Sequence, residues 1–195
     1  MNKLLYLIRH GLAKHNENFL KYGEETFFDP KYVDTHLIEE GVQQSIQLGE
    51  TWQNIDDIEL VLVSPLYRTL ETATNIFKNK DIPIISLEDL REYPIGRHTC
   101  NKRSSKELLI QDFPNINFDD IKDIDYLWKS EKGEEISSLE KRIDNIKKYI
   151  QKRSEKTICI VSHTIFLEKM KYNKISLMEN GKSEIDHCFP YTMDL

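Results

Sequence analysis

The chain has 195 residues, of which 39% are hydrophobic and 31% are charged, and its formal net charge is −6. This length suffices for one well-packed domain, and the acidic balance argues against nucleic acid or an acidic membrane as a partner of the whole surface. No run approaches membrane-spanning length, and the apolar stretch 4–8 is too short for a signal-peptide core. We therefore expect a cytoplasmic protein that forms a single domain over residues 1–195. No pattern in the sequence indicates an oligomeric state.

Four short segments are rich in apolar and β-branched residues, as expected of strands buried on both faces. They are residues 3–8, 58–63, 82–86 and 157–161. Helical patterns alternate with them at residues 39–53, 65–77 and 138–152. Ser64 is the expected N-cap of the second helix, with Pro65 at its first position. Ser137 and Glu140 have capping-box spacing at the start of the third. Strands alternating with helices predict an α/β fold of three layers, with a mostly parallel central sheet flanked by helices.

The stretch 91–132 interrupts this alternation. It is polar, aromatic and irregular, apart from a predicted helix near residues 104–112. A long insertion of this kind usually forms a lid or a binding surface. We therefore expect a lid-like insertion within the single domain.

The three cysteines, Cys100, Cys159 and Cys188, are odd in number and widely spaced. With no signal sequence, this predicts free thiols in a reducing compartment. Two histidines, His98 and His187, lie beside cysteines, but neither pair has the spacing of a known zinc site, so we predict no bound metal.

Ionisable side chains follow three of the predicted strands. Arg9 and His10 directly follow the first strand, Arg68 lies in the first turn of the helix after the second, and His163 follows the last. The carboxyl ends of parallel strands meet at one edge of a sheet, where ligands bind. Arg binds phosphate oxygens bidentately, and His can act as a nucleophile or proton carrier near neutral pH. Each residue alone could be an ordinary surface or strand-capping residue, but together the four predict a cationic pocket for a phosphoryl group.

Several segments resemble, in chain order, the signatures of the histidine phosphatase superfamily, the phosphoglycerate-mutase-like proteins. They are residues 7–11, His15-Asn16, residues 37–44, residues 64–73, Leu90-Arg91-Glu92 and Val161-Ser162-His163. The resemblance runs from residue 4 to about residue 167, and residues 96–103 resemble a subgroup of small eukaryotic-type members.

Three positions depart from the family pattern. Thr164 follows the second histidine where Gly is usual, and its Cβ could crowd a bound phosphate. Ile38 stands where Thr is common, and Asn101 replaces an acid common in the subgroup. None of these changes removes a core catalytic group, so they bear on efficiency more than on activity.

The resemblance implies a two-step, metal-independent mechanism that needs no cofactor. In it, neutral His10 attacks phosphorus to form a phosphohistidine, and Glu92 protonates the leaving oxygen and then deprotonates the attacking water. The phosphoryl oxygens would be held by Arg9, Asn16, Arg68 and His163. The arginines and His163 would supply the positive charge that a metal supplies elsewhere.

The sequence is compatible with three functions. The first is a histidine-type acid phosphatase that hydrolyses a small anionic phosphorylated metabolite. The second is a phosphoglycerate mutase, an isomerase that returns the phosphoryl group to a bound product. The segment 93–96 does not resemble the longer arrangement with which true mutases grip the carboxylate of phosphoglycerate, so hydrolysis ranks first. The third is a phosphate-ligand-binding protein that has lost turnover, which Thr164 keeps open.

Three basic residues, Arg97, Lys102 and Arg103, follow Glu92 in the irregular stretch. We expect them at the pocket mouth, where they would favour substrates with a second anionic group. A solvated basic loop is the alternative, since exposed Lys and Arg are common.

Overall fold

The computed structural model of the protein describes residues 2–175 and 183–195. Its centre is a five-stranded sheet in the order β3-β2-β4-β1-β5. The strands are β1 (Leu4–Arg9), β2 (Leu60–Val63), β3 (Ile84–Ser86), β4 (Thr157–Ser162) and β5 (Tyr191–Asp194). Strands β1 to β4 pair in parallel and β5 pairs antiparallel with β1, which confirms the predicted α/β fold with a mostly parallel sheet.

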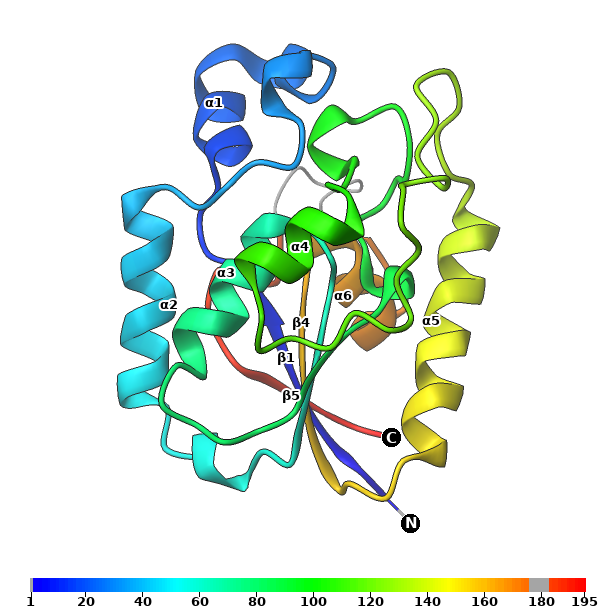
Figure 1. Cartoon of the computed structure of the whole chain (residues 1–195). Helices are drawn as coiled ribbons and strands as arrows, with labels where there is room; N and C mark the ends of the chain where they lie inside the picture. The colour runs from blue at the N-terminus through cyan, green and yellow to red at the C-terminus, as the bar shows by residue number, and fades with distance from the viewer. Residues whose placement is uncertain (1, 176–182) are drawn as a thin grey trace.

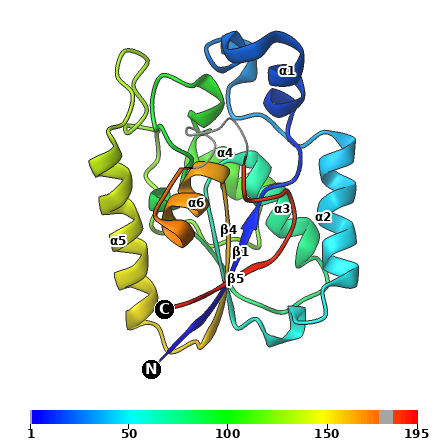
Figure 2. The ribbon, with the colours of Figure 1, turned by 180° about the vertical axis from the view of Figure 1, so that it is seen from behind.

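The two faces of the sheet bury alternate residues of the same strands, because successive side chains of a strand point to opposite faces. One face packs against α2 (Glu39–Thr51) and α3 (Tyr67–Ile76), and its core includes Ile8, Val63 and Leu70. The other packs against α5 (Ile136–Lys152) and α6 (Thr164–Tyr172), and its core includes Leu7 and Phe166. Figures 1 and 2 show the resulting three layers, with α2 and α5 on opposite sides of the sheet.

The register of the central strands sets the position of the candidate site. Arg9 is level with Ser162 across the β1–β4 pair, and Val63 is level with Val161 across the β2–β4 pair. The carboxyl ends of the three strands therefore lie side by side. In both ribbon views α1 (Lys14–Tyr22) lies beyond this edge of the sheet (Figures 1 and 2).

Two predicted helix starts were wrong. Helix α3 begins at Tyr67 with Leu66 as its N-cap, and α5 begins at Ile136 with Glu135 as its N-cap. The hydroxyl of Ser64 does not cap α3 but lies 2.8 Å from Nε2 of His163. The Ser64 hydroxyl thus makes a tertiary hydrogen bond instead of the helix-capping hydrogen bond that the local sequence predicts.

The insertion 91–132 is held by buried ion pairs, one of them within the insertion and two of them to Glu88, which precedes it. The guanidinium of Arg91 lies 2.6 Å from Asp125 and 3.2 Å from Glu88, and that of Arg103 lies 2.7 Å from Glu88. Its helix α4 (Lys106–Asp112) begins two residues later than predicted. Apolar residues of the insertion join the core on the α2 and α3 side; they are Leu109, Phe113, Ile116, Phe118 and Ile121. Much of the insertion is therefore a packed part of the fold.

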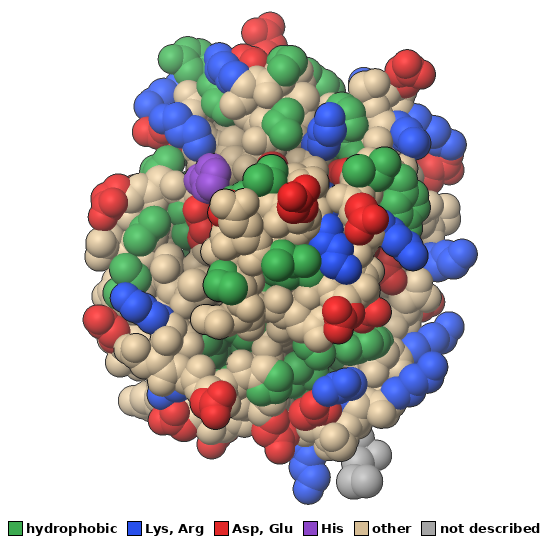
Figure 3. Space-filling model, viewed as in Figure 1, with side chains coloured by type: hydrophobic (Ala, Val, Ile, Leu, Met, Phe, Trp, Pro, Cys, Tyr) green, Lys and Arg blue, Asp and Glu red, His purple; other side chains and the backbone are tan. Residues whose placement is uncertain are grey.

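Acidic and basic side chains are interspersed over the face shown in Figure 3, with neither sign gathered into one patch. Among the described residues, no helix has the length and apolar character that crossing a membrane requires.

Candidate active site

Arg9, His10, Arg68 and His163 come together at the carboxyl edge of the sheet. The ring centroids of His10 and His163 are 5.1 Å apart, and Nε of Arg68 donates to Nε2 of His10 at 3.2 Å. Arg68 is in the first turn of α3, and His163 is the N-cap of α6. Three segments far apart in the sequence thus supply one compact cationic centre.

The hydrogen bonds of His10 fix its tautomer. Its Nδ1 lies 2.7 Å from the carbonyl oxygen of Gly11, which can only accept, so Nδ1 carries the proton. Nε2 then has the lone pair, consistent with the hydrogen bond that Arg68 donates to it. Burial and the neighbouring Arg68 guanidinium hold the pKa of His10 well below its usual range. His10 is therefore neutral near pH 7 and has a nucleophilic nitrogen facing the cations.

Arg68 is fully buried and is held by the insertion rather than by a carboxylate. Its Nη1 donates to the carbonyl oxygen of Cys100 at 2.7 Å, and its Nη2 donates to Oδ1 of Asn101 at 3.0 Å. Asn101, one of the departures from the family pattern, keeps an acceptor at this position but brings no negative charge. The charge of Arg68 is left without an ion-pair partner among the described residues, as suits a site for an anion.

Two buried polar atoms at the same centre have no hydrogen-bond partner among the described residues. They are Nε of Arg9 and Nδ1 of His163. Arg9 is held by one hydrogen bond, from Nη1 to the carbonyl oxygen of Ile185 at 3.1 Å, and burial lowers its pKa to about 10. Buried polar groups are nearly always paired, so these atoms point to an anionic ligand that would satisfy them.

Asn16 lies in the first turn of α1, the short helix that follows the end of β1. Its side-chain oxygen accepts from the backbone N–H of Ala13 at 3.1 Å. Its amide Nδ2 donates to no described residue, so it can bind an oxygen of a ligand. His15, the residue before Asn16, is also buried, and its ring centroid is 6.1 Å from that of His10. Its Nδ1 lies 2.5 Å from Oγ1 of Thr35.

Glu92 lies over the N-terminus of α6. Its carboxylate accepts backbone N–H groups of Ile165 and Phe166, both at 3.3 Å, and that of Tyr93 at 2.8 Å. Burial raises the pKa of Glu92, although these hydrogen bonds and Arg68 act in the opposite direction. A raised pKa leaves the carboxyl group able to hold a proton at higher pH than an exposed Glu.

The three basic residues expected at the pocket mouth separate into two kinds. Arg97 and Lys102 are exposed, with the guanidinium 5.8 Å from the ring centroid of Phe28 and the ammonium 5.0 Å from that of Trp128. Arg103 is buried: it pairs with Glu88 and donates to the carbonyl oxygens of Ser104, Lys122 and Ile124. Its guanidinium is engaged inside the protein, so the prediction that Arg103 lies free at the pocket mouth is wrong.

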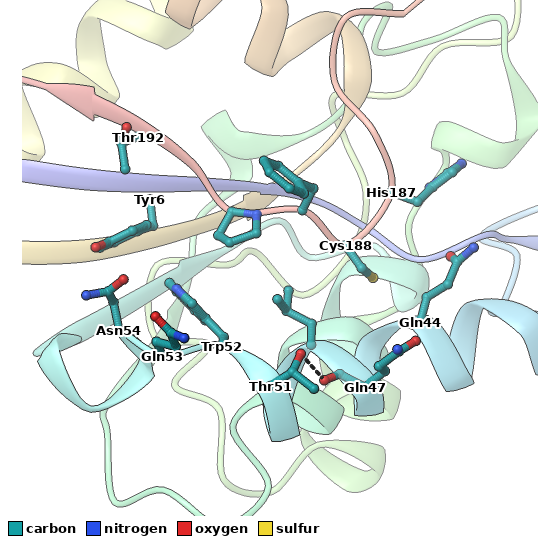
Figure 4. A pocket seen from close by; sticks show the side chains of 13 residues that line it. Tyr6, Gln44, Gln47, Thr51, Trp52, Gln53, Asn54, His187, Cys188 and Thr192 are labelled. Atoms are coloured by element: carbon teal, nitrogen blue, oxygen red, sulfur yellow. Dashed lines mark hydrogen bonds between the residues drawn. The ribbon is translucent and has the colours of Figure 1, made fainter.

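One neighbour of His10 was not expected from the sequence. His187 lies with its ring centroid 5.5 Å from that of His10, although it is far along the chain. In the sequence, its position beside Cys188 had suggested only a zinc ligand. Its proximity to His10 could have been predicted only from the return of the C-terminal segment to β1. His187 also ends a groove of about 560 Å³ between α2 and the C-terminal segment, lined by residues such as Gln47, Trp52 and Thr192 (Figure 4).

A neutral imidazole held among buried cations at the carboxyl edge of a parallel sheet is the arrangement expected of a phosphoryl-transfer protein. The chain belongs to the histidine phosphatase superfamily (branch 1), whose family model matches residues 5–173.

Similarities to individual proteins support this family membership. A phosphoglycerate mutase-like protein of Arabidopsis thaliana is 30% identical over 197 residues, covering 85% of this chain and 72% of its own. A "Probable phosphatase" of Schizosaccharomyces pombe is 27% identical over 201 residues, covering 97% of this chain and 87% of its own. The solved alpha-ribazole phosphatase from Shigella flexneri shares the fold, with a TM-score of 0.62 at 21% identity over 97% of this chain and 89% of its own.

Proposed function

We propose that the protein is a metal-independent phosphomonoester hydrolase that acts on a small phosphorylated metabolite through a phosphohistidine intermediate. The observation that carries this proposal is the state of His10: its proton is on Nδ1, its Nε2 carries the lone pair and accepts a hydrogen bond from Arg68, and Arg68 has no carboxylate partner among the described residues. We further propose that residues 1–195 form one histidine-phosphatase domain, with the insertion 91–132 as part of it.

The proposed first step is an in-line attack. Nε2 of His10 forms a bond to phosphorus as the bond from phosphorus to the leaving oxygen breaks, and Glu92 gives that oxygen its proton. Arg9, Arg68 and His163, with the amide of Asn16, offset the charge on the other phosphoryl oxygens. This is electrostatic stabilisation by groups already in place.

In the second step, water attacks the phosphohistidine. Glu92, now ionised, takes the proton of this water, the bond between phosphorus and Nε2 breaks, and inorganic phosphate leaves. The enzyme thus returns to its starting state after two displacements, each easier than the single direct one.

A pair of assays tests the function. The protein is incubated with a generic aryl phosphate in the presence of a chelator, and separately with 3-phosphoglycerate plus 2,3-bisphosphoglycerate. Release of phosphate in the first assay supports hydrolysis. Isomerised product in the second supports the mutase, an outcome that the name of the Arabidopsis relative makes worth testing. Activity in neither assay indicates a binding protein.

Turnover is expected to survive strong chelators with less than about a twofold change, because the buried arginines supply the positive charge on which metal-dependent phosphatases rely. Vanadate should inhibit by adopting the five-coordinate geometry of the transition state. The measurement is kcat/KM after dialysis against EDTA and again after adding magnesium or zinc. Loss of activity in EDTA that a metal restores would contradict the proposal.

Arg97 and Lys102 are expected to favour substrates that carry a second anionic group, because both charges are exposed on the insertion that also holds Arg68. Replacing both with Ala should lower kcat/KM for a sugar or glycerate bisphosphate by about 5- to 10-fold, as expected for two exposed charge interactions, and this loss should shrink as salt rises. A neutral aryl monophosphate should be affected much less. A matched control removes two exposed lysines of α5, Lys148 and Lys152. Equal loss for both substrates, or loss for neither, would show that these residues do not set selectivity.

A further inference from the structure

The segment that carries His187 binds directly to the end of β1. The backbone N–H of Cys188 donates to the carbonyl oxygen of Arg9 at 2.9 Å, and Arg9 and His187 pair in an isolated parallel bridge. The Arg9 guanidinium in turn donates to the carbonyl oxygen of Ile185. His187 lies beyond residues 5–173, the part of the chain that the family model matches. It is nevertheless part of the wall of the catalytic centre.

The nucleophile is surrounded by three imidazoles. Measured from the ring centroid of His10, that of His163 is 5.1 Å away, that of His187 is 5.5 Å away and that of His15 is 6.1 Å away. His187 is therefore about as close to His10 as His163 is, and His163 is already proposed to bind the phosphoryl group.

The hydrogen bonding of His187 leaves one ring nitrogen available. Its Nδ1 lies 2.5 Å from the carbonyl oxygen of His10, so Nδ1 carries the proton. Its Nε2 makes no hydrogen bond to any described residue. In Figure 4 the ring of His187 turns away from the side chains of Thr51 and Trp52 in the groove. Its ring is 5.5 Å from that of His10, so this nitrogen is a candidate donor or acceptor for a ligand bound beside His10.

The groups around His187 include a cation, neutral titratable groups and one carboxylate, that of Asp186, which precedes it and accepts a hydrogen bond from the hydroxyl of Tyr191. Arg9 faces His187 from the end of β1 and His10 from the residue after it, His15 faces it from α1, and Cys188 follows it in its own segment. Burial, followed by the charge of Arg9, lowers the pKa of His187 to about 3, so its imidazole is neutral when no anion is present. An opposite charge placed within a few ångströms acts in the other direction and favours the imidazolium.

We propose that His187 is a further phosphate-binding residue, whose Nε2 takes up a proton from solvent when a phosphoryl dianion binds and then donates a charge-assisted hydrogen bond to it. No bond of the phosphoryl group breaks in this step, and the proton leaves again with the product. The proposal rests on the phosphate pocket of the proposed function, but it does not depend on turnover.

The first test measures the binding of inorganic phosphate to the full chain by calorimetry. His187→Ala should weaken the dissociation constant about 10- to 100-fold, the range expected when a charge-assisted hydrogen bond is lost. The control is Cys188→Ser, which alters the same segment without touching the imidazole and should leave binding unchanged. Equal weakening by both variants would overturn the proposal, because it would indicate a role in packing only. Unchanged binding in His187→Ala would overturn it directly.

The second test uses the unmutated protein and so does not depend on how a variant folds. Nitrogen-15 NMR of the histidine side chains, assigned from His187→Ala or from sequential spectra, reports which ring nitrogens carry protons. At neutral pH His187 should show one protonated nitrogen in the free protein and two when phosphate is saturating. A spectrum of His187 that phosphate leaves unchanged, while signals of His163 shift, would overturn the proposal and leave the phosphate pocket intact. If no histidine signal responds to phosphate, the proposed function itself fails.

Discussion

His10→Ala is expected to lower phosphatase turnover by about 10⁴-fold or more, the loss typical when the nucleophile of a covalent mechanism is removed. No other described side chain places a neutral ring nitrogen with its lone pair against Arg68. The measurement is single-turnover phosphate release, together with quenching in alkaline denaturant after brief exposure to substrate, because phosphohistidine is stable in alkali and is hydrolysed in acid. The unmutated protein should retain an acid-labile phosphoryl group, and the variant should retain none.

The same experiment needs one control for the loss of a histidine outside the site and another for folding. His36→Ala removes a largely exposed histidine that pairs with Glu71, and it should keep full activity. The His10→Ala protein should also still unfold cooperatively, since the β1 backbone remains paired on both sides. Full activity in folded His10→Ala protein would refute the phosphohistidine mechanism.

The parts of the fold that the sequence predicted well are those controlled by local pattern and by general topology. The residues of β2 and residues 158–161 of β4 form unbroken apolar runs, because both faces of these strands are covered. Once the sheet is taken as parallel, the strand ends must share one edge. The proximity of His10, Arg68 and His163 follows from that rule without any knowledge of side-chain packing.

The parts that the sequence did not predict depend on contacts between distant segments. Strand β5 is an edge strand whose residues are half-buried and exposed in alternation, so it lacks the apolar run that marked the other strands. Its antiparallel return brings His187 to Arg9, a pairing separated by nearly the whole chain. No local pattern encodes such a contact.

Arg103 shows a different limit. Its type favours an exposed position, and its place beside Lys102 suggested a basic rim. In the fold it is buried because Glu88 neutralises it and three backbone carbonyls accept its remaining hydrogen bonds. The sequence shows that an arginine is present, but only the packed structure shows that a carboxylate and backbone carbonyl groups bind its guanidinium in the interior.

Glu92→Gln is expected to lower turnover on an alkyl phosphate about 10²- to 10⁴-fold, the usual contribution of a general acid and base, while phosphate binding changes little. The amide has nearly the same shape and can still accept from the N-terminus of α6, but it is not an acid and cannot protonate the leaving oxygen. With an aryl phosphate, whose leaving oxygen needs no proton, the first step should be almost unaffected. The burst of aryl alcohol should remain, and the later attack by water should be slow. Glu131→Gln, at an exposed position of the insertion, is the matched control.

The pKa shifts of Glu92 and His10 predict how the activity changes with pH. Burial raises the pKa of Glu92, so the acid form needed in the first step persists to higher pH than in an exposed Glu and is lost as pH rises through that pKa. The pKa of His10 is lowered, so the neutral nucleophile persists to lower pH than usual and is lost as pH falls through that value. Activity on an alkyl phosphate should therefore be greatest between these two pKa values. Glu92→Gln should abolish the decline at higher pH and keep the one at lower pH. A variant that retains both limbs and full turnover on the alkyl substrate would assign the acid role to another residue.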